Sequence, residues 1–212
     1  MQRFVRETAI LQSLRHPRIL PFMGVLDDPG RLCIVTPWMD FGELNTYLRT
    51  HPYDPRRPLA RQVFEGLLYL RSKRIVHGDM KGANILVDLH GCAHIADLGS
   101  ARIVSLQGHD SQTVPWGKRP LASGTYRWMA PELLVDNAPG LSTFESDIFA
   151  FGMVFGGRIP FHHLEPMAAN IEIIQGHRPT RPASTPNDIW TLATACWDDN
   201  PARRPAISSV VI

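Results

Sequence analysis

The stretch His77-Gly-Asp-Met-Lys-Gly-Ala-Asn84 carries a carboxylate, a cation two residues later and an amide three residues beyond the cation. It lies between a segment of helical periodicity and two short β-like runs, so its polar side chains fall on a loop. A second acid opens Asp97-Leu98-Gly99 directly after the later β-like run, and Ala130-Pro131-Glu132 follows further along. Phosphoryl transfer needs such a set: a carboxylate that accepts a hydroxyl proton, a cation that steadies the phosphoryl group, and an Asn/Asp pair that holds magnesium.

The overall composition is that of a globular protein. Of 212 residues, 44% are hydrophobic and 20% are charged, and a chain of this length buries roughly 70% of its unfolded surface. The 22 basic and 20 acidic residues leave a net charge of +2, a balance that argues against a partner such as nucleic acid or a membrane surface. Three cysteines without a CxxC pair fit thiols in a reducing compartment. With no signal-like or membrane-spanning apolar run, we expect a cytoplasmic protein, or a nuclear one.

Periodicity and turn residues outline one domain without internal repeats. Strand-like runs at 19–25 and 32–36 flank Asp27-Asp28-Pro29-Gly30 and predict an antiparallel hairpin. A second pair of runs, 85–87 and 93–95, flanks another turn, and the proline-rich segment 52–58 is predicted to be a loop. Helical patterns occur at 3–15, 43–49, 59–71, 144–155, 166–175 and 187–197. A little sheet followed by a mainly helical body predicts an α+β fold.

In this order and spacing, the three motifs resemble those of the eukaryotic protein kinases, and the resemblance runs from residue 1 to residue 212. It implies a protein-kinase-like fold in which residues 1–39 form a partial N-lobe and hinge, and residues 40–212 form a mainly helical C-lobe. The N-lobe would keep helix C and about two strands. Gly-Thr-Tyr-Arg-Trp-Met-Ala-Pro-Glu at 124–132 is similar to the tyrosine-kinase-like group of Ser/Thr kinases, and so is Ala195-Cys196-Trp197.

The resemblance implies roles for the loop residues. Asp79 would be the catalytic base, and Lys81 would contact the γ-phosphate of ATP. Lysine two residues after the base is the pattern of Ser/Thr kinases. Asn84 and Asp97 would be the ligands of Mg²⁺, and Thr125 would touch both the base and the lysine.

The resemblance also places the nucleotide. Glu7 would be the glutamate of helix C, and Thr36 would be the gatekeeper at the end of a strand. Residues 37–39 would present their backbone to adenine, Glu43 would bond the ribose, and Leu86 would pack beneath the adenine ring. The residues expected to bind ATP and its metal are therefore Glu7, Thr36, Trp38, Met39, Glu43, Asn84, Leu86 and Asp97.

Other polar and aromatic residues are predicted to have structural roles. The resemblance implies a buried ion pair of Glu132 with Arg204, and it implies that Asp147 anchors the backbone of the catalytic loop. His77 is expected to pack and hydrogen-bond inside the core rather than act as a base. The pair His162-His163 has no Cys or carboxylate at ligand spacing, which favours a loop pair over a metal site. Trp190 and Trp197 are expected to form one inward face of a helix, because they lie seven residues apart.

The sequence departs from the family in four places. No G-x-G-x-x-G loop occurs, and no lysine precedes Lys73, so the glycine-rich loop and the strand-three lysine that pairs with Glu7 are missing. The segment from Asp147 to Pro160-Phe161 is about four residues, or one helical turn, shorter than usual. Gly78 stands where the family usually has an arginine. We therefore expect an N-terminally truncated kinase domain. Losing such electrostatic contacts costs about 2.7–4 kcal/mol each in transition-state stabilisation.

Two functions remain open at this point. The first is a protein kinase that transfers the γ-phosphate of ATP to Ser/Thr of a protein substrate, weakly or not at all as this truncated chain. The alternative is a pseudokinase-like binding or scaffold module without phosphoryl transfer. A P-loop nucleotide-binding protein is excluded, because G-x₄-G-K-[ST] does not occur.

Overall fold

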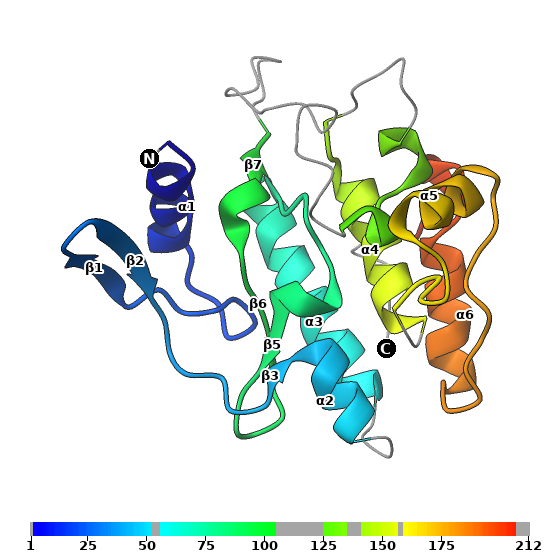
Figure 1. The fold of residues 1–212 in the computed structure, drawn as a ribbon, viewed down its shortest axis with the longest axis horizontal. Coiled ribbons are helices and arrows are strands. Elements are labelled where there is room, and N and C mark those ends of the chain that lie inside the picture. The colour runs from blue at the N-terminus through cyan, green and yellow to red at the C-terminus, as the bar shows by residue number, and fades with distance from the viewer. Residues whose placement is uncertain (1, 52–55, 105–124, 135–140, 157–158, 207–212) are drawn as a thin grey trace.

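The computed structural model describes residues 2–51, 56–104, 125–134, 141–156 and 159–206. An N-terminal helix, α1 (Gln2–Ser13), and a hairpin lie beside a mainly helical body, as Figure 1 shows. Ile10, Leu11 and Leu14 are buried, so α1 presents the apolar stripe that its sequence predicts. The helix ends before Pro17, because proline disfavours helical backbone in the residue that precedes it.

The hairpin joins β1 (Gly24–Asp28) and β2 (Arg31–Val35), with Asp28 opposite Arg31. The loop between them has two residues, Pro29 and Gly30. Gly30 has a φ of +84°, which together with proline before it is typical of a type II turn.

The predicted strand over 19–25 is wrong for residues 19–23. Ile19 forms only an isolated parallel bridge with Ile95, and the amide of Leu20 donates to the carbonyl of Ile95 at 2.8 Å. Ile19 and Leu20 are both buried. Their apolar side chains therefore dock this segment onto the body instead of extending the hairpin.

After the hairpin, the chain forms a three-stranded antiparallel sheet with the strand order β3-β5-β6. It consists of β3 (Gly42–Glu43), β5 (Ile85–Val87) and β6 (Ala93–Ile95). The predicted strands 85–87 and 93–95 are confirmed. A further pair joins β4 (Ile75–Val76) to β7 (Arg102–Ile103). Strands of two residues have no detectable alternation, so the sequence did not predict β3, β4 or β7.

Helices α2 (Leu44–Thr50) and α3 (Arg56–Ser72) follow the hairpin. The predicted loop over 52–58 is wrong for residues 56–58, because α3 already begins at Arg56, and residues 52–55 lie outside the described residues. Pro58 falls in the first turn of that helix. Backbone N–H groups in a first turn have no partner inside the helix, so the missing N–H of proline costs nothing there.

The centre of the body is α4 (Phe144–Phe155), whose residues from Ser146 to Phe155 are all buried. Thr143 and Ser146 form a reciprocal capping box that fixes where this apolar helix begins. Helices α5 (Pro166–Ile174) and α6 (Asn187–Cys196) pack around it (Figure 1). The three helices predicted for this half are confirmed, the last two ending one residue early. Short 3₁₀ helices complete the described chain: η1 (Gly82–Asn84), η2 (Leu98–Ser100), η5 (Thr125–Trp128), η6 (Pro131–Leu133) and η7 (Pro201–Arg203).

Helix α6 contacts α4 through aromatic and small residues. Trp190 and Trp197 meet edge to face with ring centroids 5.3 Å apart, and Trp197 is buried. The predicted inward face of this helix is confirmed. These helices and strands make a mixed α/β structure consistent with a kinase fold.

Candidate active site

The loop that begins at His77 is hydrogen-bonded to the central helix α4. Asp147 of α4 accepts hydrogen bonds from the backbone amides of His77 (2.7 Å) and Gly78 (2.9 Å), one on each carboxylate oxygen. The predicted anchor is therefore present. Burial raises the pKa of Asp147 to about 6, and the nearby His77 and the two amide donors only partly oppose this shift.

His77 fixes the same loop from its side chain. Its ring is fully buried, with Nε2 2.9 Å from the carbonyl oxygen of Ala96 and Nδ1 3.2 Å from the amide of Asp79. Because an amide can only donate, Nδ1 accepts and Nε2 carries the proton that it donates to Ala96. The ring has no nitrogen left for proton transfer, which agrees with the predicted structural role.

Asp79, Lys81, Asn84 and Thr125 form one hydrogen-bonded cluster. Lys81 Nζ lies 3.0 Å from Asp79 Oδ2 and 2.9 Å from Thr125 Oγ1. Asn84 Nδ2 donates to the carbonyl of Asp79 (2.8 Å) and to its Oδ2 (3.1 Å). The sequence separates Thr125 from this loop by more than forty residues, and η5 brings it back across the site. The predicted contact of Thr125 is present with Lys81.

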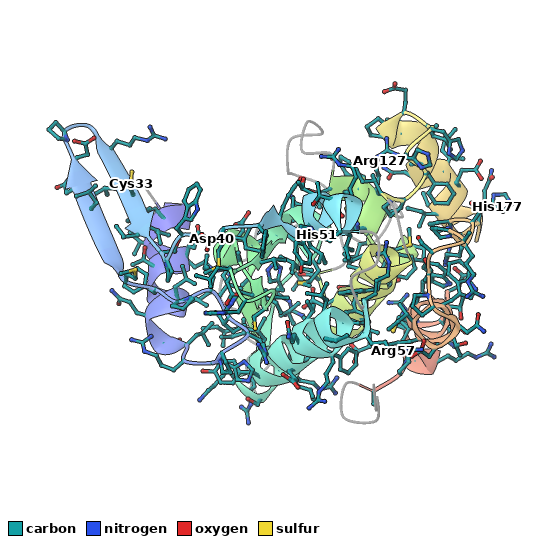
Figure 2. All side chains as sticks on the ribbon, turned by 90° about the horizontal axis from the view of Figure 1, so that it is seen from below. Cys33, Asp40, His51, Arg57, Arg127 and His177 are labelled. Carbon is teal, nitrogen blue, oxygen red and sulfur yellow. The ribbon has the colours of Figure 1, made fainter. Side chains whose placement is uncertain are left out.

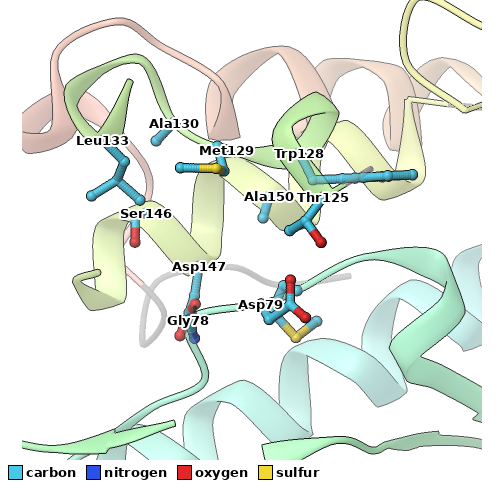
Figure 3. A pocket seen from close by; sticks show the side chains of 11 residues that line it. Gly78, Asp79, Thr125, Trp128, Met129, Ala130, Leu133, Ser146, Asp147 and Ala150 are labelled. Atoms are coloured by element: carbon cyan, nitrogen blue, oxygen red, sulfur yellow. Dashed lines mark hydrogen bonds between the residues drawn. The ribbon is translucent and has the colours of Figure 1, made fainter. Parts of the chain in front are cut away.

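The second oxygen of Asp79 is left without a hydrogen bond. Asp79 is 8% exposed, and its Oδ1 is buried with no partner among the described residues. It faces a small cavity between the loop and η5, lined also by Thr125, Trp128 and Met129 (Figure 3). A buried carboxylate oxygen without a donor costs free energy. The arrangement therefore leaves an acceptor ready for a hydroxyl group.

Asp97 stands at the end of β6 beside Asn84. The amide of Ala96 donates to the carbonyl of Asn84 at 2.9 Å, which joins the two segments. Asp97 has left-handed backbone angles (φ 55°, ψ 70°), which aspartate tolerates better than most residues, and its Oδ1 accepts from the amide of Gly99.

The chemistry of this pair fits a magnesium ion. Mg²⁺ takes oxygen ligands, commonly one or two carboxylates together with the phosphates of a substrate. Asp97 supplies a carboxylate. Asn84 uses its amide nitrogen to bind Asp79, which leaves its oxygen for a cation.

The residues expected around adenine, ribose and phosphate lie on four parts of the chain: β3, β5, the segment after β2, and α1. Glu43 of β3 and Leu86 of β5 are directly paired across the sheet, and Glu43 Oε1 accepts from Thr46 Oγ1 at 3.1 Å. Thr36, Pro37 and Met39 follow β2 and are half-buried, whereas Trp38 is 84% exposed. Glu7 lies on α1, which packs against η2 just after Asp97. The structure thus joins Glu43 to Leu86 and turns the side chain of Trp38 to solvent.

Two further predictions concern side chains away from the loop. Arg204 Nη1 and Nη2 bind the two carboxylate oxygens of Glu132 at 2.6 and 2.8 Å, so the predicted ion pair is confirmed. His162 and His163 are exposed and meet edge to face. Across the described ranges, no group of three or more His, Cys, Asp or Glu side chains is arranged to hold a metal ion.

Two arginines near the site were not predicted from the sequence. Arg102 of β7 is buried, donates to the carbonyl of Ser142, and lowers the pKa of Asp147 against the effect of burial. Arg127 of η5 donates to three backbone carbonyls. Both contacts join segments that are far apart in the chain and therefore leave no local pattern. The only signal was the excess of arginine over lysine in the sequence.

Comparison with known proteins identifies the family. The model of the protein tyrosine and serine/threonine kinase family matches residues 1–212, so the chain belongs to the protein kinases. It is 31% identical over 99% of its length to the serine/threonine-protein kinase STY46 of Arabidopsis thaliana. It is 34% identical over 98% to the serine/threonine-protein kinase TNNI3K of Mus musculus, and 32% identical over 99% to the megakaryocyte-associated tyrosine-protein kinase of Rattus norvegicus.

The chain spans 36%, 25% and 44% of the lengths of these three relatives. The predicted resemblance to the protein kinases is confirmed, and STY46 and TNNI3K belong to the tyrosine-kinase-like group that the motifs indicated. In the described part of the chain, no helix has both the length and the apolar character needed to cross a membrane.

Proposed function

We propose that this chain is the catalytic part of a protein Ser/Thr kinase that uses ATP and Mg²⁺. The observation that carries the proposal is the cluster of Asp79, Lys81 and Thr125, in which Asp79 Oδ1 lacks a hydrogen-bond partner among the described residues. In this proposal residues 1–39 form part of an N-lobe with the hinge, and residues 40–212 form the C-lobe.

The geometry supports a direct phosphoryl transfer. The substrate hydroxyl donates a hydrogen bond to Asp79 Oδ1, its oxygen attacks the γ-phosphorus, and the bond from that phosphorus to the bridging oxygen of ADP breaks. Asp79 receives the hydroxyl proton. Lys81, already within 3.0 Å of Asp79, carries the positive charge that offsets negative charge on the phosphoryl oxygens.

The nucleotide is assigned to the residues between the hinge and the loop. Asn84 and Asp97 would hold the magnesium ion, which neutralises phosphate charge when it is bound. The backbone of residues 37–39, with Trp38 and Met39, would face adenine next to Thr36. Glu43 and Leu86, paired across the sheet, would contact the ribose and the adenine ring, and Glu7 would lie on the phosphate side.

The position of Lys81 supports Ser/Thr over Tyr as the acceptor. Its ammonium group bridges Asp79 and Thr125, the arrangement that the Ser/Thr pattern implies. STY46 and TNNI3K are named as serine/threonine kinases, whereas the rat relative is named as a tyrosine kinase. We therefore propose serine or threonine as the acceptor, and the experiment below identifies which residue type is phosphorylated.

A pseudokinase-like scaffold is the second candidate. It is favoured by one observation, that these 212 residues contain neither a glycine-rich loop nor a lysine before Lys73. Such a module would bind a partner through the same fold and transfer no phosphate.

The test is transfer of labelled γ-phosphate from ATP to the protein itself and to a generic basic protein. We expect transfer to serine or threonine, identified by phosphoamino-acid analysis, and a fall of at least about 100-fold in Asp79→Asn. Asp188→Asn is the control, since Asp188 is an exposed aspartate that pairs with Arg57 far from the loop. Equal transfer by the wild type and Asp79→Asn would reject the proposed base. No transfer by the wild type would favour the scaffold.

A further inference from the structure

Arg127 clamps two segments of the body together. Its guanidinium donates to the carbonyls of Pro160 (3.1 Å), Phe161 (2.5 Å) and Leu164 (2.5 Å). These three carbonyls belong to the turn between α4 and α5, whereas Arg127 itself lies on η5. Figure 2 shows Arg127 where η5 meets the segment that leads into α5.

The turn needs such a donor. Phe161 is buried and has a φ of +49°, an uncommon backbone angle for an aromatic residue. The carbonyl of Phe161 also accepts from the amide of Leu164 at 2.9 Å inside the turn, whereas the carbonyls of Pro160 and Leu164 take their side-chain donor from Arg127. A guanidinium offers five N–H donors in one rigid plane, and the ammonium of lysine does not reproduce that fork.

Within the part of the chain that the structure describes, no opposite charge holds Arg127. Among the described residues its hydrogen-bond partners are backbone carbonyls, and no carboxylate pairs with it. The geometry of the fork, rather than the charge, therefore holds the turn. A substitution that keeps the charge and loses the fork separates the two contributions.

The same short helix carries Thr125. η5 has only four residues, Thr125–Trp128, so a movement of Arg127 is transmitted over two residues to the hydroxyl that binds Lys81 at 2.9 Å. One end of η5 is bound by Lys81, which also binds Asp79, and the other end is bound to the α4–α5 turn through Arg127. The cavity beside Asp79 is lined by Thr125 and Trp128 of this helix.

We propose that Arg127 is a positioning residue of the phosphoryl-transfer site, which holds Thr125 against Lys81 by fixing η5 to the α4–α5 turn. The inference rests on the proposed kinase function. Arg127 touches neither Asp79 nor the transferred group, and it acts through Thr125.

Arg178 offers a matched control. It also donates to three backbone carbonyls, those of Trp197 (2.9 Å), Ile173 (3.2 Å) and His177 (2.8 Å), and it pairs with Asp199. None of these contacts involves η5 or the loop at Asp79. Arg178→Lys therefore removes a comparable clamp from the same body without moving Thr125.

The kinetic test compares Arg127→Lys with Arg178→Lys under conditions in which both are folded by melting curve. We expect Arg127→Lys to lower kcat about tenfold while the KM for ATP stays within about twofold. Arg178→Lys is expected to leave both constants unchanged. Equal kcat values for Arg127→Lys and the wild type would overturn the proposal, and so would an equal fall in Arg178→Lys.

A double variant tests whether Arg127 acts through Thr125. If it does, Arg127→Lys will cause no further fall in kcat once Thr125→Ala is present. Two independent effects would multiply, and that result would overturn the coupling.

Hydrogen exchange separates the clamp from the chemistry. We expect the amides of residues 126–130 and 159–164 to exchange at least about tenfold faster in Arg127→Lys and at the wild-type rate in Arg178→Lys. A wild type without phosphate transfer would reject the proposed function, while this exchange pattern would still establish the clamp. Unchanged exchange in Arg127→Lys would reject the clamp whether or not the protein is active.

Discussion

Gly78 stands where the family usually has an arginine, and the surroundings of Gly78 favour glycine. Its φ is +75°, and a Cβ would lie 2.7 Å from Ser142 Oγ and 3.0 Å from the carbonyl oxygen of Ser100. Both the backbone angle and the space therefore favour glycine. A longer side chain on the loop at this position would meet both the strained backbone angle and this crowding.

We expect Gly78→Ala to reduce the free energy of unfolding by about 2–4 kcal/mol, combining strain at positive φ with crowding. Gly176→Ala is the control, because Gly176 has a φ of +83° but its nearest neighbour would be at an ordinary 3.4 Å. It should lose only about 1–2 kcal/mol. Urea denaturation measures both, and equal losses would show that crowding at Gly78 is unimportant.

Asp147 gives the stability of the fold a pH dependence. Its pKa of about 6 in the folded protein lies above the ordinary 3.8, so the folded protein keeps a proton that the unfolded chain releases. Its stabilising contribution is full below about pH 3.8 and is lost as the pH rises to about 6, a loss of about 3 kcal/mol.

We expect Asp147→Asn to flatten this fall in unfolding free energy between about pH 4 and pH 6, because asparagine does not titrate. Urea denaturation at several pH values measures the slope, so a variant that is less stable throughout still gives an answer. Asp188→Asn should keep the slope, since the hydrogen bond from Arg57 lowers the pKa of Asp188. An unchanged slope in Asp147→Asn would assign the titration to another group.

At the level of the helices, α4 and α6 pack so closely at Gly152 that the contact leaves no room for a side chain there. A Cβ on Gly152 would lie 2.8 Å from both the carbonyl oxygen of Ala193 and the Cβ of Cys196. Neither atom can turn aside, because one belongs to the backbone and the other is fixed to it. The two helices can approach only where one of them has no side chain.

We expect Gly152→Ala to destabilise the protein by about 1–3 kcal/mol, despite the higher helix propensity of alanine. Gly66→Ala should cost less, because its closest neighbour is the flexible end of Ile95 at 2.7 Å. Thermal unfolding compares the two variants. A larger loss in Gly66→Ala would contradict this account of the α4–α6 contact.

Elements of three residues or more could largely be predicted from the sequence, because their apolar side chains repeat with the period of the structure or are bounded by turn residues. Helix α4 was predicted over its observed range, and the strands of β5 and β6 likewise. The antiparallel hairpin was predicted correctly, but its first strand was placed too early, because the apolar side chains of Ile19 and Leu20 are buried by docking and not by strand pairing. A local pattern does not distinguish these two ways of burying a side chain.

The loop site was predictable because its residues lie close together in the sequence. Asp79, Lys81 and Asn84 occupy one short stretch, and the family resemblance added Thr125. Arg127 and Arg102 were missed, since their partners are carbonyl groups that any residue supplies. Contacts of this kind depend on the path of the backbone and leave no residue-specific trace.

At the scale of the whole molecule, Glu132 and Arg204 join η6 to the C-terminal part of the described chain. Arg204 is 5% exposed and also donates to the carbonyls of Asp198 and Glu145. Its guanidinium lies 5.0 Å from the centre of the Phe149 ring on α4. A single buried cation therefore holds three separate parts of the body.

We expect Glu132→Gln to lower the free energy of unfolding by about 3–5 kcal/mol, because it leaves a buried cation uncompensated. Melting temperature should fall by about 10 °C. Glu145→Gln is the control, since the pair of Glu145 with Arg71 is more than 40% exposed on both sides and is worth at most about 1 kcal/mol. Similar losses in both variants would mean that burial does not govern the strength of these pairs.

The hairpin of β1 and β2 is the part of the fold least tied to the central helix (Figure 1). Val25, Leu26 and Leu32 are each at least 39% exposed, and Ile34 is the one strand residue that packs against the core. A two-stranded hairpin is marginal by itself. Brief treatment of the folded protein with a protease should therefore cut within residues 24–35 first, and the helical body should persist as a resistant fragment.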